Sequence, residues 1–214
     1  MADHSAIQAA IAVLTRLGYA VNISRNQTCC GALYRHNGLP EKAQQLCDQN
    51  RKITQTSRAQ ALITIATACQ LELLEQQASH IPVISITNFV LQHLQLMQRQ
   101  ADLKSISGRV LLHMPCTARK EPVDQLLGLI PGLTLELFPD NGICCGAAGS
   151  YLLTQPKLAT QLGEDKLEHL KAAAPSILVT SNTGCAIQFR RLLKREKLPI
   201  EVLHPIELIN RQLS

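Results

Sequence analysis

Eight cysteines are the residues of this sequence with the most evident capacity for chemistry. They lie at eight positions: Cys29, Cys30, Cys47, Cys69, Cys116, Cys144, Cys145 and Cys185. An even number would predict disulfides in an exported chain, but the first residues do not resemble an export signal, and a reducing cytosol disfavours structural disulfides. Adjacent cysteines also rarely bond to each other, because one peptide link constrains their geometry. The clustered thiols therefore indicate a metal or redox site.

The cysteines belong to an internal repeat. Cys29-Cys30-Gly31 recurs as Cys144-Cys145-Gly146, and Thr67-Ala68-Cys69 recurs as Thr183-Gly184-Cys185 at nearly the same spacing. A repeated pattern of this kind indicates two copies of one structural unit. Buried cysteines that merely fill a core would not be expected to recur in this way.

The same order of elements is predicted around each cysteine pair. Before the pair we expect a helix, a glycine-containing stop and a short strand: Ala9–Arg16 then Tyr19–Ile23, and Val123–Ile130 then Leu133–Leu137. After the pair we expect a helix opened by proline, a strand ending in the Thr-x-Cys element and a further helix: Pro40–Thr54, Ala61–Ile65 and Leu71–Gln77, then Pro156–Ala173, Ser176–Val179 and Ala186–Lys197.

This alternation predicts an α/β fold of two similar halves, each a mostly parallel sheet with flanking helices. The cysteines at strand ends should gather at the carboxyl edge of the sheets, where such folds bind ligands. We place the first repeat in residues 1–100 and the second in 101–214, with the seam near Gln98–Gly108. The second repeat opens with a further strand, Arg109–Met114, before Cys116. The first repeat lacks this strand and its cysteine, so either the strand is absent or the start of the chain is incomplete.

The second half contains four thiols that are candidate ligands: Cys116, Cys144, Cys145 and Cys185. Four cysteines are the usual ligand set of a [4Fe–4S] cluster, and a zinc ion also accepts four thiolates. Structural zinc sites usually contain C-x2–4-C pairs, which are absent here, whereas an adjacent Cys-Cys pair suits two corners of a larger cluster. We expect the glycine after each pair to let the backbone approach the cluster and offer it an N–H group.

The remaining candidates are weaker. The first half offers three thiols, Cys29, Cys30 and Cys69, one short of a full set, so a second cluster there is a separate question. Cys47 has no counterpart in the repeat and is interpreted as packing. His113 is interpreted either as a hydrogen-bonded core residue or as a ligand or proton relay. Three further residues are candidates for shaping the pocket: Tyr151, Asn182 and Thr183.

Composition excludes several other classes of protein. Hydrophobic residues make up 46% of the 214 residues and charged residues 17%, which is enough for a core and too apolar for a disordered chain. Aromatic residues are 3%, with no Trp, and the net charge is +5, so neither base stacking nor a basic surface indicates a nucleic-acid partner. The basic run that starts at Arg190 is interpreted as a solvated helix face or a docking surface for an acidic partner.

Cofactor and targeting motifs are also missing. The sequence contains no G-x-G-x-x-G and no Walker A motif, which argues against a bound nucleotide. It has no apolar stretch of roughly 18 residues, so we expect a cytoplasmic protein that is not integral to a membrane and whose peripheral attachment would require a partner.

Several segments resemble the cysteine-rich CCG domain family, whose members include iron–sulfur subunits of hydroxy-acid-oxidising and heterodisulfide-reducing enzymes. The strongest likeness is to the iron–sulfur subunit of glycolate oxidase. The resemblance spans nearly the whole chain and rests mainly on these stretches: His113-Met114-Pro115-Cys116-Thr117, Cys144-Cys145-Gly146-Ala147-Ala148-Gly149-Ser150-Tyr151, Thr180-Ser181-Asn182-Thr183-Gly184-Cys185 and His204-Pro205-Ile206-Glu207-Leu208-Ile209.

The resemblance implies an electron-transfer component of a flavin-linked 2-hydroxy-acid (glycolate- or lactate-type) oxidising complex. It implies a [4Fe–4S] cluster, a flavoprotein partner and a ferredoxin-like or quinone-linked acceptor. Unlike the glycolate oxidase subunit, this chain has no ferredoxin-like C-x2-C-x2-C-x3-C-P run. Ala66 and Asn182 stand where heterodisulfide reductases have an extra cysteine, which weakens the interpretation as a thiol–disulfide reductase. A zinc-stabilised interaction module and an inactive remnant of a longer subunit are two competing interpretations.

Overall fold

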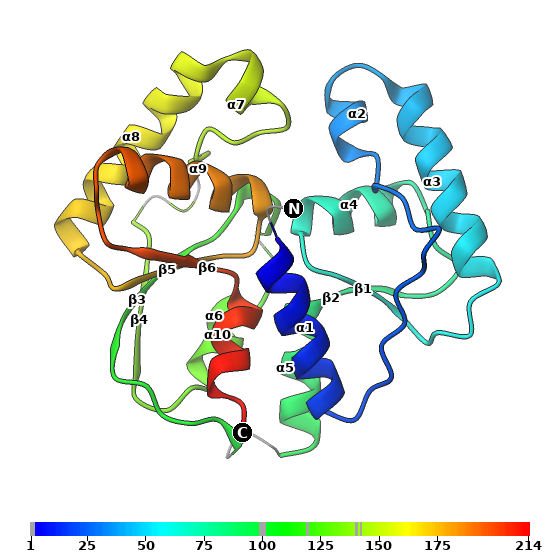
Figure 1. Ribbon diagram of the computed structural model, residues 1–214, viewed down its shortest axis with the longest axis horizontal. Helices are drawn as coiled ribbons and strands as arrows, with labels where there is room; N and C mark the ends of the chain where they lie inside the picture. Colours follow the sequence, from blue (N-terminus) through cyan, green and yellow to red (C-terminus); the bar gives the residue numbers. More distant parts are fainter. Residues whose placement is uncertain (1–2, 99–101, 119, 140, 142) are drawn as a thin grey trace.

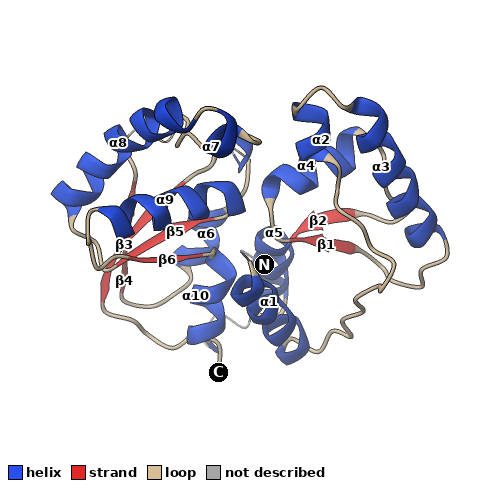
Figure 2. Ribbon diagram, turned by 45° about the horizontal axis from the view of Figure 1, so that its top comes forward, coloured by secondary structure: helices blue, strands red, loops and turns tan. Residues whose placement is uncertain are grey.

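A computed structural model of the protein describes residues 3–98, 102–118, 120–139, 141 and 143–214. The chain forms two α/β halves that lie side by side, with helices on both faces of each sheet (Figures 1 and 2). This confirms the predicted fold class. Part of the expected seam, residues 99–101, lies outside the described residues. No helix in the described part of the chain has both the length and the apolar character needed to cross a membrane.

The second half is built on a four-stranded parallel sheet. Its strands are ordered β4-β3-β5-β6, with these bounds: β3 Gly108–His113, β4 Leu133–Leu137, β5 Ile177–Thr180 and β6 Glu201–Leu203. Because side chains alternate along a strand, Val110 and Leu112 face one core while Leu111 and His113 face the other. Because every pairing in this sheet is parallel, all four carboxyl ends lie at one edge of the sheet.

Helices cover both faces of this sheet (Figure 1). One face packs on α6 (Val123–Gly128) and α10 (Pro205–Gln212), and the other on α8 (Pro156–Ala173) and α9 (Thr183–Arg195). The short helices α7 (Tyr151–Thr154) and η2 (Cys116–Ala118) follow the cysteine pair and β3 respectively.

The first half repeats this plan with a smaller sheet. Its two strands, β1 (Leu62–Thr64) and β2 (Val83–Ser85), are parallel. The helices have these bounds: α1 His4–Arg16, α2 Ala32–His36, α3 Pro40–Gln55, α4 Thr67–Glu75 and α5 Ile86–Leu96. Helix α1 packs on α10, and α5 packs on α6. Their apolar faces belong to one core that both halves share.

The prediction of a strand at Tyr19–Ile23 is wrong, since this segment is irregular. Its counterpart β4 joins the second sheet only by pairing with β3, and the described part of the first half has no strand equivalent to β3. The segment is instead attached to α5, because Tyr19 Oη lies 2.8 Å from His93 Nδ1 and the Tyr19 ring packs edge-on against Phe89. Ile23, without a sheet to cover it, is 61% exposed.

Other elements also differ from the prediction, among them two helix starts, two strands and the helices α5 and α10, which were not predicted. The helices after the Thr-x-Cys elements begin at Thr67 and Thr183, so Cys69 and Cys185 lie in the first helical turn and not before it. Strands β2 and β6 were not predicted, because each contains only three residues and shows little of the alternation that identifies a strand.

His204 joins the two halves. It caps α10, where its Nδ1 accepts the Ile206 N–H at 3.1 Å, and its Nε2 lies 3.0 Å from the Ile65 carbonyl oxygen of the first half. This pairing requires a neutral imidazole with its hydrogen on Nε2. Burial lowers the pKa of His204 from 6.5 to about 4, although the Ile65 carbonyl opposes the shift.

The free energy of unfolding should therefore depend on pH through His204. His204 takes up a proton below about pH 6.5 in the unfolded chain but only near pH 4 in the folded protein. Its contribution to the free energy of unfolding is therefore fully present above pH 6.5 and is lost as the pH is lowered. Urea titrations at pH 7.5 and 5 should differ by about 2 kcal/mol more for the wild type than for His204→Asn. The exposed His80, changed to Asn, is the control and should keep the wild-type dependence. An equal pH dependence in His204→Asn and the wild type would contradict this role.

Candidate metal centre

Three buried side chains converge at the carboxyl edge of the second sheet. One ligand atom each from His113, Cys145 and Cys185 lies within 4.8 Å of the other two. Cys145 Sγ donates to Cys185 Sγ at 2.9 Å. We call these three residues the inner trio; among the described residues, no other group of His, Cys, Asp or Glu meets this criterion.

The strand register places His113 in this trio. Residues 113 and 180 are partners on the parallel strands β3 and β5, so their side chains lie next to each other on the same face. His113 Nδ1 is 3.0 Å from Thr180 Oγ1, and the His113 ring packs edge-on against Phe189 and Phe138. The imidazole is thus fixed on three sides.

Cys185 reaches the trio because α9 begins directly after β5. Asn182 caps this helix, and its Oδ1 accepts the Gly184 N–H at 2.9 Å. The first turn of a helix carries unpaired N–H groups and a partial positive charge, which favour an anionic thiolate. Asn182 therefore has a capping role, and Thr183, which donates to the Asp3 carboxylate, ties the helix to the first half.

The loop that carries Cys144 and Cys145 depends on Gly146. Gly146 has φ of +84°, and a Cβ at this position would lie 2.2 Å from the carbonyl oxygen of Ala159 in the first turn of α8. The Gly146 N–H lies 3.4 Å from Cys144 Sγ, to which it donates. Gly31 repeats the arrangement in the first half, where a Cβ would lie 2.9 Å from the carbonyl oxygen of Ala43 in α3. The glycine is thus required for close packing as well as for an N–H directed at sulfur.

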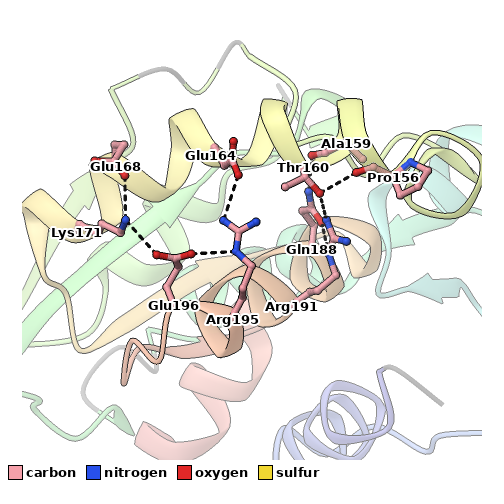
Figure 3. Close-up of polar contacts among 10 residues, drawn as sticks. All are labelled: Pro156, Ala159, Thr160, Glu164, Glu168, Lys171, Gln188, Arg191, Arg195 and Glu196. Carbon is pink, nitrogen blue, oxygen red and sulfur yellow. Dashed lines mark hydrogen bonds and ion pairs between the residues drawn. The ribbon is translucent and has the colours of Figure 1, made fainter.

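Gln188 fixes α8 against α9 below this loop (Figure 3). Its buried side chain donates to the Ala159 carbonyl at 2.6 Å, which is the same carbonyl that Gly146 approaches. The Arg191 guanidinium donates to Gln188 Oε1 on its own helix and to Thr160 Oγ1 on α8. Further along, Arg195 pairs with Glu164 and Glu196. Arg191 and Arg195, two residues of the basic run, are thus engaged with neighbouring side chains.

The thiols of the loop are held in their protonated form when no cation is bound. A hydrogen bond with Cys144 lowers the pKa of Cys145, but the contact with Cys185 and burial outweigh it and raise this pKa to about 12. The contact with Cys145 and burial likewise raise the pKa of Cys144. A bound metal cation would reverse this balance and displace the protons.

Cys116 lies apart from the inner trio, in η2, where its side chain is exposed. The next residue, Thr117, joins the two halves, because its Oγ1 lies 2.8 Å from Thr67 Oγ1 and accepts from Asn182 Nδ2 at 3.2 Å. Cys116 therefore follows β3 at the junction between the starts of α4 and α9.

The thiols of the first half form a related group. The contact between Cys30 and Cys69, with burial, raises the pKa of Cys30, whereas the same contact lowers the pKa of Cys69. Cys29 is exposed. Cys47 is fully buried and donates to the Cys30 carbonyl at 3.4 Å, so it packs beneath the loop.

Two polar residues near the sites were missed by sequence reasoning, Gln188 and Glu72. Glu72 is 4% exposed and pairs with Arg35 at 2.6 Å beside Cys47 in the first half. Helical spacing from Cys185 to Gln188 and from Cys69 to Glu72 was the available signal, but polar residues at such positions are usually solvent-facing. Tyr151, another candidate, begins α7 and is half-buried.

Comparison with known proteins agrees with the repeat. The cysteine-rich domain family CCG matches residues 4–74 and 110–190. The glycolate oxidase iron–sulfur subunit of Escherichia coli is 30% identical over 94% of this chain and 53% of its own length. Lactate utilization protein A of a Geobacillus species is 25% identical over 95% of this chain and 91% of its own length. The protein of the same name from Halalkalibacterium halodurans is 22% identical over 94% of this chain and 88% of its own length.

The chain consists of two α/β units, each with a parallel sheet and a Cys-Cys-Gly loop at the carboxyl edge of that sheet. It belongs to the cysteine-rich CCG domain family. It spans about half the length of the Escherichia coli relative and nearly all of the Geobacillus relative. Among solved structures, glutamate racemase RacE1 of Bacillus anthracis aligns over 97% of this chain and 75% of its own with a TM-score of 0.42 at 11% identity, a likeness from which no function follows.

Gly146→Ala should destabilise the protein much more than Gly38→Ala. Both glycines have positive φ, +84° and +75°, but a Cβ at Gly38 meets nothing within 4 Å. The control variant should lose about 1–2 kcal/mol from the left-handed backbone alone. Gly146→Ala should lose that amount plus about 1–3 kcal/mol because the Cβ displaces Ala159. Guanidinium titrations of both variants would measure the difference, and equal losses would contradict the packing role of Gly146.

Proposed function

We propose that this chain is an iron–sulfur electron-transfer component of a flavin-linked 2-hydroxy-acid oxidising complex. Substrate would be oxidised on a separate flavoprotein subunit. This chain would take up the electrons and pass them to a ferredoxin-like or quinone-linked acceptor. The relatives named as iron–sulfur subunits and lactate utilization proteins support this proposal, and the family membership supports a cysteine-ligated group.

The observation that carries the proposal is the buried thiol pair of the inner trio. Cys145 and Cys185 come from segments far apart in the sequence and both are buried, and Cys145 also contacts Cys144. With Cys116 they form the ligand set that we propose for a [4Fe–4S] cluster. For two irons of one cluster to be bound, the sulfurs of Cys145 and Cys185 must move apart from their present contact.

The surrounding residues fit an anionic, sulfur-rich group. Gly146 directs its N–H toward Cys144 Sγ, and the N-terminus of α9 lies at Cys185. Both features stabilise negative charge on sulfur. An iron–sulfur cluster in this position would supply one-electron transfer, and the buried wall of Phe138 and Phe189 would keep water from its inner side.

A single zinc ion is the second candidate. The three donor atoms of the inner trio lie within 4.8 Å of one another, which is close to the spacing of ligands around one tetrahedral ion. In that case the chain would be a zinc-stabilised interaction module without redox activity. A thiol–disulfide reductase is less well supported, because Asn182 caps α9 where an additional thiol would be needed.

Replacing Cys185 by Ser should remove most of the bound iron from anaerobically purified protein. Thiolate is a much better ligand than a hydroxyl for these irons, and Cys185 is central to the trio. Cys47→Ser is the matched control, because Cys47 is also buried but lies under the loop of the first half. It should keep the wild-type iron. Iron, sulfide and zinc would be quantified in each protein.

The same measurement counts the clusters. We propose that the first half, with Cys29, Cys30 and Cys69 alone, is empty or weakly occupied, so that the wild type holds about four irons per chain. About seven or eight irons, of which Cys29→Ser loses half, would instead make the first half a second cluster site. Colourless wild-type protein with one zinc per chain would contradict the electron-transfer function. Iron retained in Cys185→Ser but lost in Cys47→Ser would contradict the ligand assignment.

A further inference from the structure

His113, a member of the inner trio, has one ring nitrogen without a hydrogen-bond partner among the described residues. The residue is 1% exposed, and its Nε2 is one of the few buried side-chain polar atoms in the described part of the chain that has no hydrogen-bond partner. A buried polar atom without a partner is destabilising, so a contact of this nitrogen with a bound group would relieve a cost in the fold.

The position of the imidazole limits what this nitrogen can contact. His113 belongs to the trio with Cys145 and Cys185, and its other nitrogen is engaged with Thr180 at 3.0 Å. When the Thr180 hydroxyl donates to Nδ1, the imidazole hydrogen is on Nε2, and this is the nitrogen that is left for the two sulfurs of the trio. The Phe189 and Phe138 rings, with centroids 4.8 and 5.8 Å from that of His113, prevent the imidazole from turning away.

We propose that His113 is a positioning residue for the metal centre: its Nε2–H donates to the thiolate sulfur of Cys145 or Cys185 and makes the centre easier to reduce. This rests on the proposed iron–sulfur function. Reduction adds one electron to the cluster and therefore negative charge to its sulfurs. A hydrogen bond to those sulfurs is stronger in the reduced form and raises the reduction potential.

A buried basic side chain lies near His113. Lys166 is also buried and lies on the same side of the sheet, with its Nζ 5.3 Å from the centroid of the Phe138 ring. The carboxylates of Asp3 and Glu72 are engaged instead with Thr183 and Arg35. The effect of His113 is thus separable by changing this residue alone.

The test uses two substitutions that preserve different halves of the imidazole. His113→Gln can place an amide N–H near the position of Nε2, whereas His113→Asn can keep only the contact with Thr180. Redox titration of the anaerobic protein should show a lower potential for His113→Asn, by about tenfold in the reduction equilibrium or about 59 mV for one electron. His113→Gln should restore most of the wild-type value. Both variants should keep wild-type iron, because all four thiols remain.

Wild-type protein with 15N-labelled histidine provides a second test that does not depend on the folding of a variant. Pulsed EPR of the reduced cluster should show a weak 15N coupling, as expected across a hydrogen bond. A strong coupling would mean that His113 ligates iron directly, and no coupling would mean that it does not reach the centre; either result overturns the assignment. Unchanged potentials in an iron-loaded His113→Asn protein would also overturn it. Iron-free wild-type protein would overturn the proposed function, and this assignment with it.

Discussion

The structure of both sites depends on the close packing of a glycine against the first turn of a helix. At Gly146 and Gly31 the loop backbone lies so near the carbonyl oxygens of Ala159 and Ala43 that a Cβ would clash. Directly before this contact lies the second cysteine of each pair, and it contacts Cys185 in α9 or Cys69 in α4. In the second half Gln188 donates to the same Ala159 carbonyl, so the loop, α8 and α9 form one unit around Cys145 and Cys185.

Around this contact, the two halves depend on each other. The core beneath both sheets is shared, and Thr117 joins the N-terminal ends of α4 and α9 through its hydroxyl. His204 of the second half caps α10 and reaches the Ile65 carbonyl of the first. The thiols of Cys144 and Cys145, by contrast, are kept protonated by burial and by contacts with neighbouring thiols. A metal cation would relieve this cost, which links metal binding to stability.

The sequence was sufficient to predict features that are local or repeated. The recurrence of Cys-Cys-Gly identified both loops, and the alternation at Leu133–Leu137 predicted β4 with its observed bounds. It was insufficient where pairing decides: Tyr19–Ile23 has the same alternation, but the described part of the first half offers it no strand to pair with. Nor can spacing show that His113 and Thr180 are register partners, or that Gln188 is buried, because both depend on how distant segments pack. The ligand roles of the cysteines remain predictions.

The central claim is that the carboxyl edge of the second sheet binds an iron–sulfur cluster through thiols brought together by the Gly146 loop and α9. Anomalous diffraction at the iron absorption edge, from crystals grown without oxygen, tests this most directly. The predicted result is strong iron scattering bounded by Cys144, Cys145 and Cys185, with His113 on its inner side. A single peak there at the zinc edge, without iron, or iron located away from these thiols, would contradict the claim.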